Sequence, residues 1–502
     1  MVDTVSQTPT AKVKRLVAPC IRACPAGIDV PRYIGLIEKG RFAEAVAVVR
    51  EKLPLPSVCS HVCYRPCEPM CRRKSMDAPV LINALKRAAT DRDRLVWRAR
   101  WQATIAAPTG KRVAVVGSGP AGLSAAYYLG KRCGHSVTVL EAAPELGGQL
   151  RTGIPAYRLP RHVLDEDIDV VTETRVEVST SHRVNSLDDL FRQGYDAIVL
   201  AVGTCRANKL NIPGEDIPGV MDCLGFLSDV NLGQPVPVGK RVAVVGGGNV
   251  AVDGARTALR MGAQEVTIVY RRTRAEMPAY SFEVHAAEEE GVKLHFLAAP
   301  RSVEAADGHL RLHLIKMELG EPDASGRRRP VPVPGSDFSM DVDTVLAAIG
   351  QAPDHTEAWG VELNKDGTLK VDPTTMLTSR EGVFAGGDVV TGPLNFTEAI
   401  AAGRRAASAI DRYLGGSGDT SEVLAPLEGD EMEFSQALHP VGVEPLHMKE
   451  LDPGTRSSSF DEVDLGYTED EAVHEARRCI RCDLWRLKGV PVVWPRGKKF
   501  TD

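Results

Sequence analysis

The sequence contains no apolar run that approaches the roughly 20 residues needed by a membrane-spanning helix. It also has no excess of basic residues: its formal net charge is −5, which argues against a general nucleic-acid binder. Its N-terminus, Met1 to Val17, is polar and mixed in charge, without the apolar stretch of a secretory signal. These absences predict a cytoplasmic protein that neither enters a membrane nor binds nucleic acid. The length of 502 residues allows several domains with sizeable cores.

Cysteine is scarce in the middle of the chain and concentrated near its two ends. The cytosol keeps thiols reduced, so the eleven cysteines are not expected to form structural disulfides. Cys133, Cys205 and Cys223 have no motif partners and are predicted to be buried small hydrophobes. The other eight predict metal ligation and are Cys20, Cys24, Cys59, Cys63, Cys67, Cys71, Cys479 and Cys482.

A first nucleotide-binding turn follows the apolar run 112–116, where Gly117, Gly119 and Gly122 form the pattern GxGxxG. The first glycine permits a tight turn, the second lets the backbone approach a pyrophosphate, and the third lets helix and strand pack closely. The phosphates would lie at the helix N-terminus. The next apolar run ends in Glu141, whose carboxylate can accept hydrogen bonds from an adenosine ribose. A purely structural glycine-rich turn would not explain Glu141, so the pattern predicts a dinucleotide site.

A second turn of the same kind lies about 130 residues further along, after the run 241–245. It has the pattern GxGxxA, and its predicted cofactor-binding residues are Gly246, Gly248, Asn249, Val250 and Ala251. The following strand, 265–270, ends in Arg271 and Arg272 where an NAD site would have an acidic residue. Arginines pair with a 2′-phosphate, so NADP is favoured over NAD. NAD stays open, because these arginines could also be solvated surface charges.

The segment from Glu145 to Pro160 resembles the flavin-proximal loop of the glutamate synthase small-subunit family. That family includes the NADPH-side subunits of bifurcating transhydrogenases and the N-terminal half of dihydropyrimidine dehydrogenase. The segments 197–204 and 382–388 also match it. The resemblance implies that the first site binds FAD, with a carboxylate on the ribityl chain and a helix N-terminus facing the isoalloxazine. The residues it assigns to FAD are Gly148, Gln149, Leu150, Arg158, Gly387, Asp388 and Thr397.

The predicted fold class is α/β, with two Rossmann-like dinucleotide-binding domains and an N-terminal α-helical iron–sulfur domain. The nicotinamide domain, 236–344, is expected to be inserted between two parts of the FAD domain, 108–235 and 345–415. Residues 1–107 form the iron–sulfur domain, and the extension 416–502 is expected to fold back onto it. Hydride transfer between stacked cofactor rings needs no side-chain acid or base, so no catalytic residue is assigned. The nicotinamide domain lacks a Cys-x-x-Cys, which argues against a dithiol mechanism.

Eight cysteines suffice for two [4Fe–4S] clusters at four ligands each. Zinc, or a redox dithiol at Cys479 and Cys482, is the alternative. A neighbouring flavin needs a one-electron outlet and zinc has no redox chemistry, which favours clusters. Relatives place Cys-x2-Cys-x4-Cys-x3-Cys-Pro in one N-terminal run, whereas here only Cys20 and Cys24-Pro25 are present. The segment 475–482 resembles the missing half, so we expect a permuted ligand run.

The permutation predicts that Cys479 and Cys482 complete one cluster with Cys20 and, by family analogy, Cys71. The second cluster would be held by Cys24, Cys63, Cys67 and a fourth ligand. Some relatives use a downstream Gln or Glu, where this chain has Lys86. Lysine is a poor ligand, so Cys59 is the predicted fourth.

Together these features predict an electron-transfer oxidoreductase subunit. It would pass electrons between NAD(P)H and a partner through FAD and the clusters, as part of a hetero-oligomer. The partner would be a catalytic subunit or a ferredoxin-like electron carrier. A self-contained flavin enzyme acting on a small substrate or ferredoxin is the alternative, although no additional substrate domain is visible. A non-catalytic scaffold is a third possibility, disfavoured because both nucleotide turns are intact. Neither the partner nor the direction of electron flow can be derived from the sequence.

Overall fold

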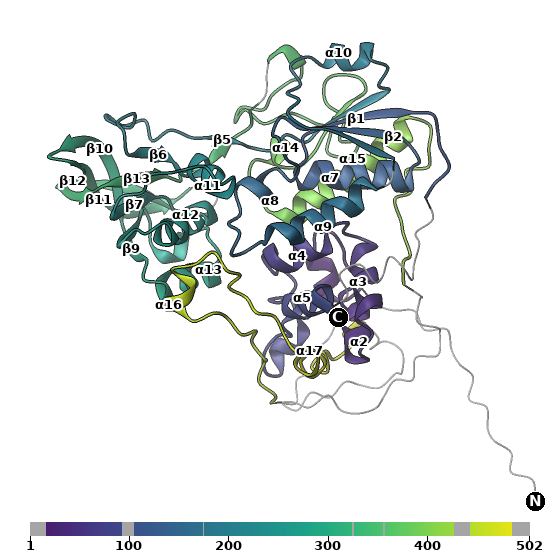
Figure 1. The fold of residues 1–502 in the computed structure, drawn as a ribbon, viewed down its shortest axis with the longest axis horizontal. Helices are drawn as coiled ribbons and strands as arrows, with labels where there is room; N and C mark the ends of the chain where they lie inside the picture. The colour runs from purple at the N-terminus through teal and green to yellow at the C-terminus, as the bar shows by residue number, and fades with distance from the viewer. Residues whose placement is uncertain are drawn as a thin grey trace, which may run out of the picture. The chain divides into compact units, whose positions relative to one another are not determined.

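The computed structural model describes residues 17–92, 105–173, 175–323, 326–354, 357–425 and 442–483. They belong to two compact units (Figure 1). The first unit combines Met1–Thr104 with Ser421–Lys449 and Gly466–Asp502, and the second combines Ile105–Thr420 with Glu450–Leu465. No helix among the described residues is both long and apolar enough to cross a membrane.

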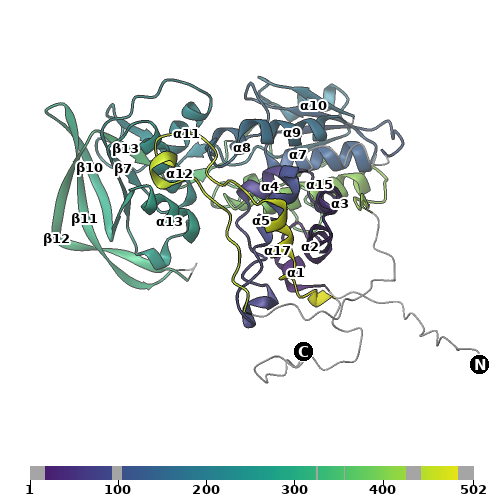
Figure 2. The ribbon, with the colours of Figure 1, turned by 60° about the horizontal axis from the view of Figure 1, so that its bottom comes forward.

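The first unit is helical. Its elements are α1 (Pro19–Ala23), α2 (Val30–Glu38), α3 (Phe42–Arg50), α4 (Pro56–Val62), η1 (Arg72–Ser75), α5 (Ile82–Arg92) and α17 (Glu469–Ala476). Helix α17 begins with a capping box, in which Thr468 and Glu471 satisfy each other's free backbone N–H groups. It packs against α2 and α5, although more than 370 residues separate these helices in the sequence (Figure 2). The C-terminal part of the chain therefore completes the N-terminal helical core.

The second unit contains a first parallel sheet with the strand order β15-β4-β1-β2-β3. The strands are β1 (Arg112–Val116), β2 (Ser136–Leu140), β3 (Val176–Ser179), β4 (Ala197–Leu200) and β15 (Val383–Ala385). The accompanying helices are α7 (Pro120–Tyr127), η2 (Tyr128–Arg132), α8 (Gln149–Thr152), α9 (Arg161–Thr172), α10 (Leu187–Arg192), α14 (Asp388–Thr391) and α15 (Phe396–Tyr413). Helix α15 packs on α7, so the late segment 383–413 joins the fold that begins at β1.

A second parallel sheet has the order β6-β13-β7-β8-β9. The strands are β6 (Val220–Asp222), β7 (Arg241–Val245), β8 (Glu265–Tyr270), β9 (Lys293–Phe296) and β13 (Thr344–Ala347). The helical elements are α11 (Cys223–Asn231), α12 (Asn249–Arg260), η3 (Arg274–Glu276) and α13 (Ser281–Glu289). Strand β6 and helix α11 lie before residue 236, so this sheet recruits residues earlier than the expected domain start.

The chain passes between the two parallel sheets twice, and the two connecting segments lie next to each other. Strand β5 (Arg206–Ala207) pairs antiparallel with β14 (Gln351–Ala352). A separate antiparallel sheet consists of β10 (Ala298–Ala306), β11 (His309–Pro322) and β12 (Arg328–Val342). Its apolar face, including Leu312 and Leu314, packs on Ala243 and Val345 of the second parallel sheet. A short 3-10 turn, η4 (Glu357–Trp359), follows β14.

Residues 450–465 of the C-terminal extension belong to the second unit, and the chain enters the first unit again at Gly466. The segment 450–465 carries α16 (Pro453–Arg456). The guanidinium group of Arg456 is buried and forms ion pairs with Glu289 and, at 3.3 Å, with Glu290. The backbone N–H of Val463 donates to the carbonyl of Tyr157 at 3.1 Å. These contacts secure residues 450–465 before the chain continues to α17.

Candidate functional site

The first glycine-rich turn lies between β1 and α7, and space constrains two of its three glycines. Gly117 has φ = +100°, and a Cβ there would lie 2.6 Å from the carbonyl oxygen of Ala201. A Cβ on Gly122 would lie 2.0 Å from the carbonyl oxygen of Gly117. A Cβ on Gly119 would meet no heavy atom within 4 Å. The middle glycine therefore faces open space at the N-terminus of α7, where an anionic phosphate is favoured.

Glu141, at the end of β2, is held against this turn. Its Oε2 accepts hydrogen bonds from Ser118 N at 2.8 Å and Ser118 Oγ at 2.6 Å, and its Oε1 accepts one from Ala143 N at 2.8 Å. The side chain is 9% exposed. The predicted ribose-binding carboxylate is thus fixed beside the backbone of the turn.

Two further segments predicted to bind flavin approach the same turn. Gly148 has φ = +51°, and a Cβ there would lie 2.9 Å from Gly119 Cα. A Cβ on Gly387 would lie 2.8 Å from the Cβ of Ala121 at the start of α7. Side chains at these positions would collide with the turn, so both glycines are required by close backbone approach.

Asp388 begins helix α14, and Thr397 lies in the first turn of helix α15. Burial raises the pKa of Asp388 to about 6, against the effect of a 3.4 Å hydrogen bond from Leu394 N. Thr397 is buried and donates to Oδ1 of Asn395, the residue that caps α15. A partly buried carboxylate with one weak partner is suited to accept hydrogen bonds from ligand hydroxyl groups.

The flavin-loop residues differ in their contacts. Leu150 is 2% exposed, and Gln149 Nε2 donates to the Thr204 carbonyl at 2.6 Å and to Gln351 Oε1 at 3.0 Å. Gln149 therefore links the loop to both β4–β5 and β14.

Arg158, which was assigned to FAD, contacts the second sheet's helices instead. It forms ion pairs with Asp253 at 2.7 Å and Glu283 at 2.5 Å. Burial raises the pKa of Asp253 to about 6, although the charge of Arg158 opposes the shift. A buried guanidinium with two carboxylate partners is occupied by the protein, so this arginine links the flavin loop to α12 and α13.

The second glycine-rich turn, between β7 and α12, repeats the geometry of the first. A Cβ on Gly246 would lie 2.2 Å from the carbonyl oxygen of Ala348, whereas Gly248 faces open space. Asn249 Oδ1 accepts a hydrogen bond from Tyr280 N at 3.0 Å. Val250 follows in the first turn of α12, and Ala251 is fully buried against the sheet core. The backbone is therefore shaped for a second dinucleotide.

The two arginines after β8, both predicted to bind the 2′-phosphate, have different surroundings. Arg271 is exposed. Arg272 is 6% exposed; it pairs with Asp323 at 2.7 Å and donates from Nε to the Arg328 carbonyl at 2.8 Å. Its guanidinium ties β8 to the β11–β12 hairpin, so Arg271 is the one of the two that faces solvent.

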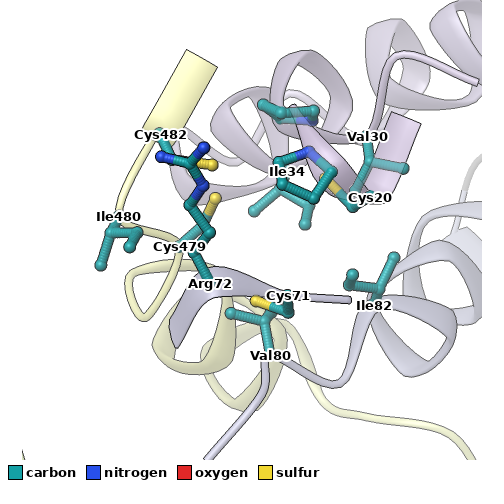
Figure 3. Close-up of a pocket in the computed structure, with 12 residues that line it drawn as sticks. Cys20, Val30, Ile34, Cys71, Arg72, Val80, Ile82, Cys479, Ile480 and Cys482 are labelled. Atoms are coloured by element: carbon teal, nitrogen blue, oxygen red, sulfur yellow. The ribbon is translucent and has the colours of Figure 1, made fainter. Parts of the chain in front are cut away.

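Four of the eight terminal cysteines line one pocket in the first unit. Cys20 comes from α1, Cys71 from the residue before η1, and Cys479 and Cys482 from the loop after α17 (Figure 3). The rest of the lining is largely apolar and includes Val30, Ile34, Val80 and Ile82. Burial raises the pKa of Cys20 well above its usual range, that of Cys479 to about 12 and that of Cys482 to about 11.

Buried charges hold the C-terminal cysteine loop in this place. Glu475 is fully buried and accepts hydrogen bonds from Leu81 N at 2.9 Å and Leu446 N at 3.0 Å. It also pairs with Arg478 at 2.7 Å. Arg478 in turn donates to the carbonyl of Ala78 at 2.8 Å and contacts Asp77 at 3.3 Å. Glu475 lies in the last turn of α17 and Arg478 immediately precedes Cys479, so this network fixes the loop against segment 77–81.

The other four cysteines are all under the electrostatic influence of Lys86 on α5. Its Nζ donates to Cys59 Sγ at 2.9 Å, and its charge acts on Cys24, Cys63 and Cys67 as well. A hydrogen bond from Cys59 and, against the effect of burial, the charge of Lys86 lower the pKa of Cys63 to about 5. Burial raises the pKa of Cys24, Cys59 and Cys67. Lys86, at the position where some relatives have a cluster ligand, thus donates a hydrogen bond to the sulfur of Cys59.

The spacing of ligand atoms bears on whether a single zinc ion could be held. Four thiolates around one zinc lie about 3.8 Å apart, as follows from Zn–S bonds of about 2.3 Å in a tetrahedron. Within the described ranges, the one group of three potential metal-ligand atoms within 4.8 Å of one another is Cys133, His135 and Asp411. Among the described residues, no three of the eight terminal cysteines bring their sulfurs this close together, as a mononuclear zinc site would require.

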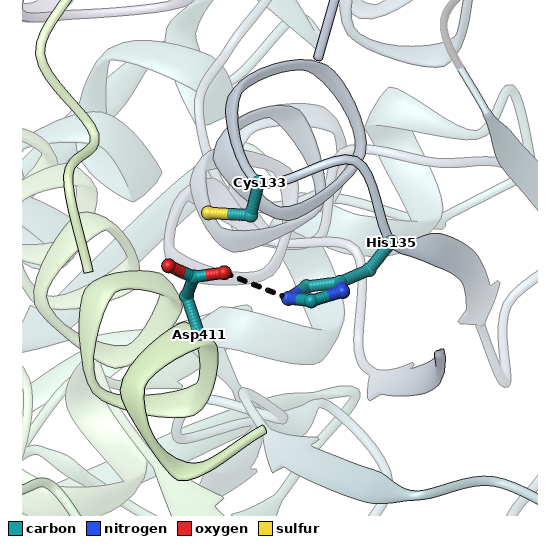
Figure 4. A group of neighbouring side chains, drawn as sticks. All are labelled: Cys133, His135 and Asp411. Atoms are coloured by element: carbon teal, nitrogen blue, oxygen red, sulfur yellow. Dashed lines mark hydrogen bonds and ion pairs between the residues drawn. The ribbon is translucent and has the colours of Figure 1, made fainter. Parts of the chain in front are cut away.

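The three remaining cysteines differ from one another. Cys223 is fully buried, as predicted, and its thiol donates to the Val250 carbonyl. Cys205 is exposed, so its predicted burial is wrong. Cys133 is buried, but its sulfur faces Asp411, which also contacts His135 Nε2 at 3.1 Å (Figure 4). Thr109 meets the other ring nitrogen of this histidine at 2.7 Å, so the group forms a satisfied polar link to α15.

Comparison with known families defines the class of protein. Residues 107–403 match the pyridine nucleotide-disulphide oxidoreductase family, and residues 13–96 match dihydropyrimidine dehydrogenase domain II, 4Fe-4S cluster. The fold of the second unit is also that of Mycobacterium tuberculosis FprA in complex with NADPH, with a TM-score of 0.53 at 22% identity over 61% of this chain and 85% of that one. The chain is thus a pyridine-nucleotide flavoprotein with an iron–sulfur domain.

The chain belongs to the glutamate synthase small-subunit family. It is 44% identical to the NADP(+)-dependent formate dehydrogenase subunit beta of Moorella thermoacetica, covering 93% of this chain and 70% of that one. It is 40% identical to the NADPH-Fe(3+) oxidoreductase subunit beta of Geobacter sulfurreducens, covering 94% and 76%. It is 36% identical to the glutamate synthase [NADPH] small chain of Escherichia coli, covering 79% and 88%. It is an NAD(P)H-dependent FAD and iron–sulfur electron-transfer subunit, as the sequence predicted.

Proposed function

We propose that this chain exchanges electrons between NADPH and a separate redox subunit, through FAD and two [4Fe–4S] clusters. NADPH and FAD supply the hydride chemistry, while the protein binds and orients them. The turn Gly246–Ala251 would hold NADPH and the turn Gly117–Gly122 would hold FAD, with Glu141 at the ribose and Asp388 at the ribityl chain. The eight cysteines would hold the clusters, which would accept electrons from the flavin one at a time.

The observation that carries the two-cluster proposal is the division of the eight sulfurs into two groups. Cys20, Cys71, Cys479 and Cys482 line one apolar pocket, and three widely separated parts of the sequence contribute them. Cys24, Cys59, Cys63 and Cys67 are the cysteines on which the charge of Lys86 acts, and Cys59 accepts its hydrogen bond. Four sulfurs in each group match the ligand requirement of a [4Fe–4S] cluster.

NADPH is preferred over NADH because of the charge after β8. Arg271 is exposed at the carboxyl end of that strand, the edge at which an adenosine ribose is bound in this fold. A guanidinium group there pairs with a 2′-phosphate, and the position carries no carboxylate that would select NAD.

The ligand sets are tested by exchanging two cysteines in the full-length holoprotein. The double variant Cys479→Ser, Cys482→Ser should lose about four irons per chain while keeping FAD. Cys205→Ser is the matched control, because Cys205 is exposed and outside both groups. Iron and flavin are measured on the same anaerobic preparation. Full iron content in the double variant would contradict the permuted ligand run.

The partner is tested by isolating the native complex and identifying its other chains. The relatives are described as beta subunits of a formate dehydrogenase and an NADPH-Fe(3+) oxidoreductase, which supports a separate catalytic subunit here. The isolated chain should reduce viologen dyes with NADPH, whereas turnover of the physiological substrate should need the copurifying subunit. Substrate turnover by the chain alone would instead favour a self-contained flavin enzyme.

A further inference from the structure

Lys86 is a buried lysine, 5% exposed, in the middle of α5. Lysine is almost never buried without a partner, because the loss of hydration of its ammonium group is costly. Its hydrogen-bond partner is a sulfur: Nζ lies 2.9 Å from Cys59 Sγ. The structure thus places a fixed positive charge among sulfur atoms.

The charge is directed at one of the two cysteine groups. Lys86 acts electrostatically on Cys24, Cys59, Cys63 and Cys67, the proposed ligands of the second cluster. The strongest influences on Cys20, in the other group, are burial, its group members Cys479, Cys482 and Cys71, and Cys67 of the second group, rather than Lys86. Its effect is therefore expected to be specific to the second group.

The next residue on the same helix, Arg87, provides a comparison, because it is a buried cation with a carboxylate partner. Arg87 is 6% exposed, and its Nε pairs with Asp91 at 2.6 Å, one helical turn away. Lys86 instead uses its charge on Cys59. The two adjacent buried cations therefore differ in their partners: Arg87 pairs with a carboxylate, whereas Lys86 donates to a sulfur that is a proposed cluster ligand.

We propose that Lys86 is a positioning residue that raises the reduction potential of the second [4Fe–4S] cluster through its hydrogen bond to Cys59. This inference rests on the proposed function. Four thiolates give an oxidised [4Fe–4S]²⁺ centre a net charge of −2, and uptake of one electron makes it −3 without forming or breaking a bond. A buried cation stabilises the more negative state more strongly, and hydrogen bonds to ligand sulfur act in the same direction. Reduced flavin is the electron donor in the proposed function.

The proposal is tested by redox titration of the holoprotein, monitored by electron paramagnetic resonance. In Lys86→Leu, which removes the charge and cannot ligate iron, one cluster should show a reduced-to-oxidised ratio at least ten-fold lower at the same potential. For a one-electron couple this corresponds to 59 mV. The other cluster should be unaffected. Lys86→Arg, which keeps the charge, should restore most of the ratio, and Arg87→Leu should leave both clusters unchanged.

Measuring iron content distinguishes failure of the proposed role of Lys86 from failure of the proposed two-cluster function. Lys86→Leu with full iron and unchanged potentials would overturn the role of Lys86. Loss of about four irons from Lys86→Leu would also overturn it, since Lys86 would then be needed to hold the cluster rather than to tune it. A wild-type protein with zinc, or with a single cluster, would refute the two-cluster function itself, independently of the variant.

Discussion

Replacing Arg271 by alanine is expected to raise the KM for NADPH while leaving the KM for NADH nearly unchanged. Arg271 is exposed, so its removal should alter the free energy of unfolding by less than about 0.5 kcal/mol. A hydrogen bond to a charged group contributes about 1.5–3 kcal/mol. At 1.4 kcal/mol per factor of ten, the KM for NADPH should rise roughly 10- to 150-fold.

Arg272→Ala should behave differently, because Arg272 is buried and engaged within the protein. Its loss removes hydrogen bonds of 2.7 Å to Asp323 and 2.8 Å to the Arg328 carbonyl. The Asp323 side chain is 23% exposed and would lose its ion-pair partner, at a cost of about 1–3 kcal/mol. The expected result is a lower melting temperature, with similar effects on NADPH and NADH.

Both variants are assayed by steady-state oxidation of each nucleotide with a viologen acceptor, alongside thermal unfolding. Arg271→Lys serves as a control, since it keeps a point charge without the guanidinium fork and should give an intermediate KM. The reasoning fails if Arg271→Ala raises both KM values by the same factor. It also fails if Arg272→Ala impairs NADPH alone at an unchanged melting temperature.

Three other perturbations have distinct expected outcomes. Gly119→Val should abolish flavin binding without destabilising the flavin-free protein in urea, because a Cβ at this position meets open space. Gly117→Ala should both abolish flavin binding and lower the stability of the flavin-free protein. Equal unfolding curves for the two variants would contradict this expectation. Glu475→Gln breaks a fully buried ion pair and should cost about 3–5 kcal/mol and about four irons while FAD is retained; unchanged iron and urea midpoint would contradict it. Burial raises the pKa of Asp388 to about 6, so the flavin-free protein should lose up to about 3 kcal/mol of stability as pH rises from about 4 to 6. Asp388→Asn should have a shallower slope, because only the contribution of Asp388 is removed while that of Asp253 remains, and a slope equal to wild type would refute the assignment.

The sequence was sufficient to predict features that depend on short spacing. A tight turn, a backbone that must approach phosphate and a helix that must pack on a strand all require glycine at fixed offsets, so Gly117, Gly119 and Gly122 predict their own geometry. The apolar runs before both turns form parallel strands, as predicted. The antiparallel sheet β10–β12 was not foreseen, because its strands gain their burial only by packing on another sheet.

The site illustrates the same limit. Arg271 and Arg272 are adjacent and chemically identical, and only a partner 51 residues away, Asp323, determines which of them is buried. Arg158 matches a flavin-loop motif, yet Asp253 and Glu283 attract its charge to α12 and α13. Pairing of this kind depends on residues brought together from distant segments, which local patterns do not encode.

The sequence by itself determined the two nucleotide turns, the carboxylate that follows the first, and the presence of eight grouped cysteines. The sequence, with its family resemblance, also predicted which sulfurs belong together, but only the tertiary structure decided how they meet: α17 packs on α2 and α5, and Cys479 and Cys482 line one pocket with Cys20 and Cys71. The tertiary structure also decided that Lys86 donates to Cys59, because the hydrogen-bond partner of a buried lysine depends on which side chains pack around it. Functions that depend on residue type and short spacing can be predicted from the sequence, whereas functions that depend on burial and on distances between remote residues are determined by tertiary packing.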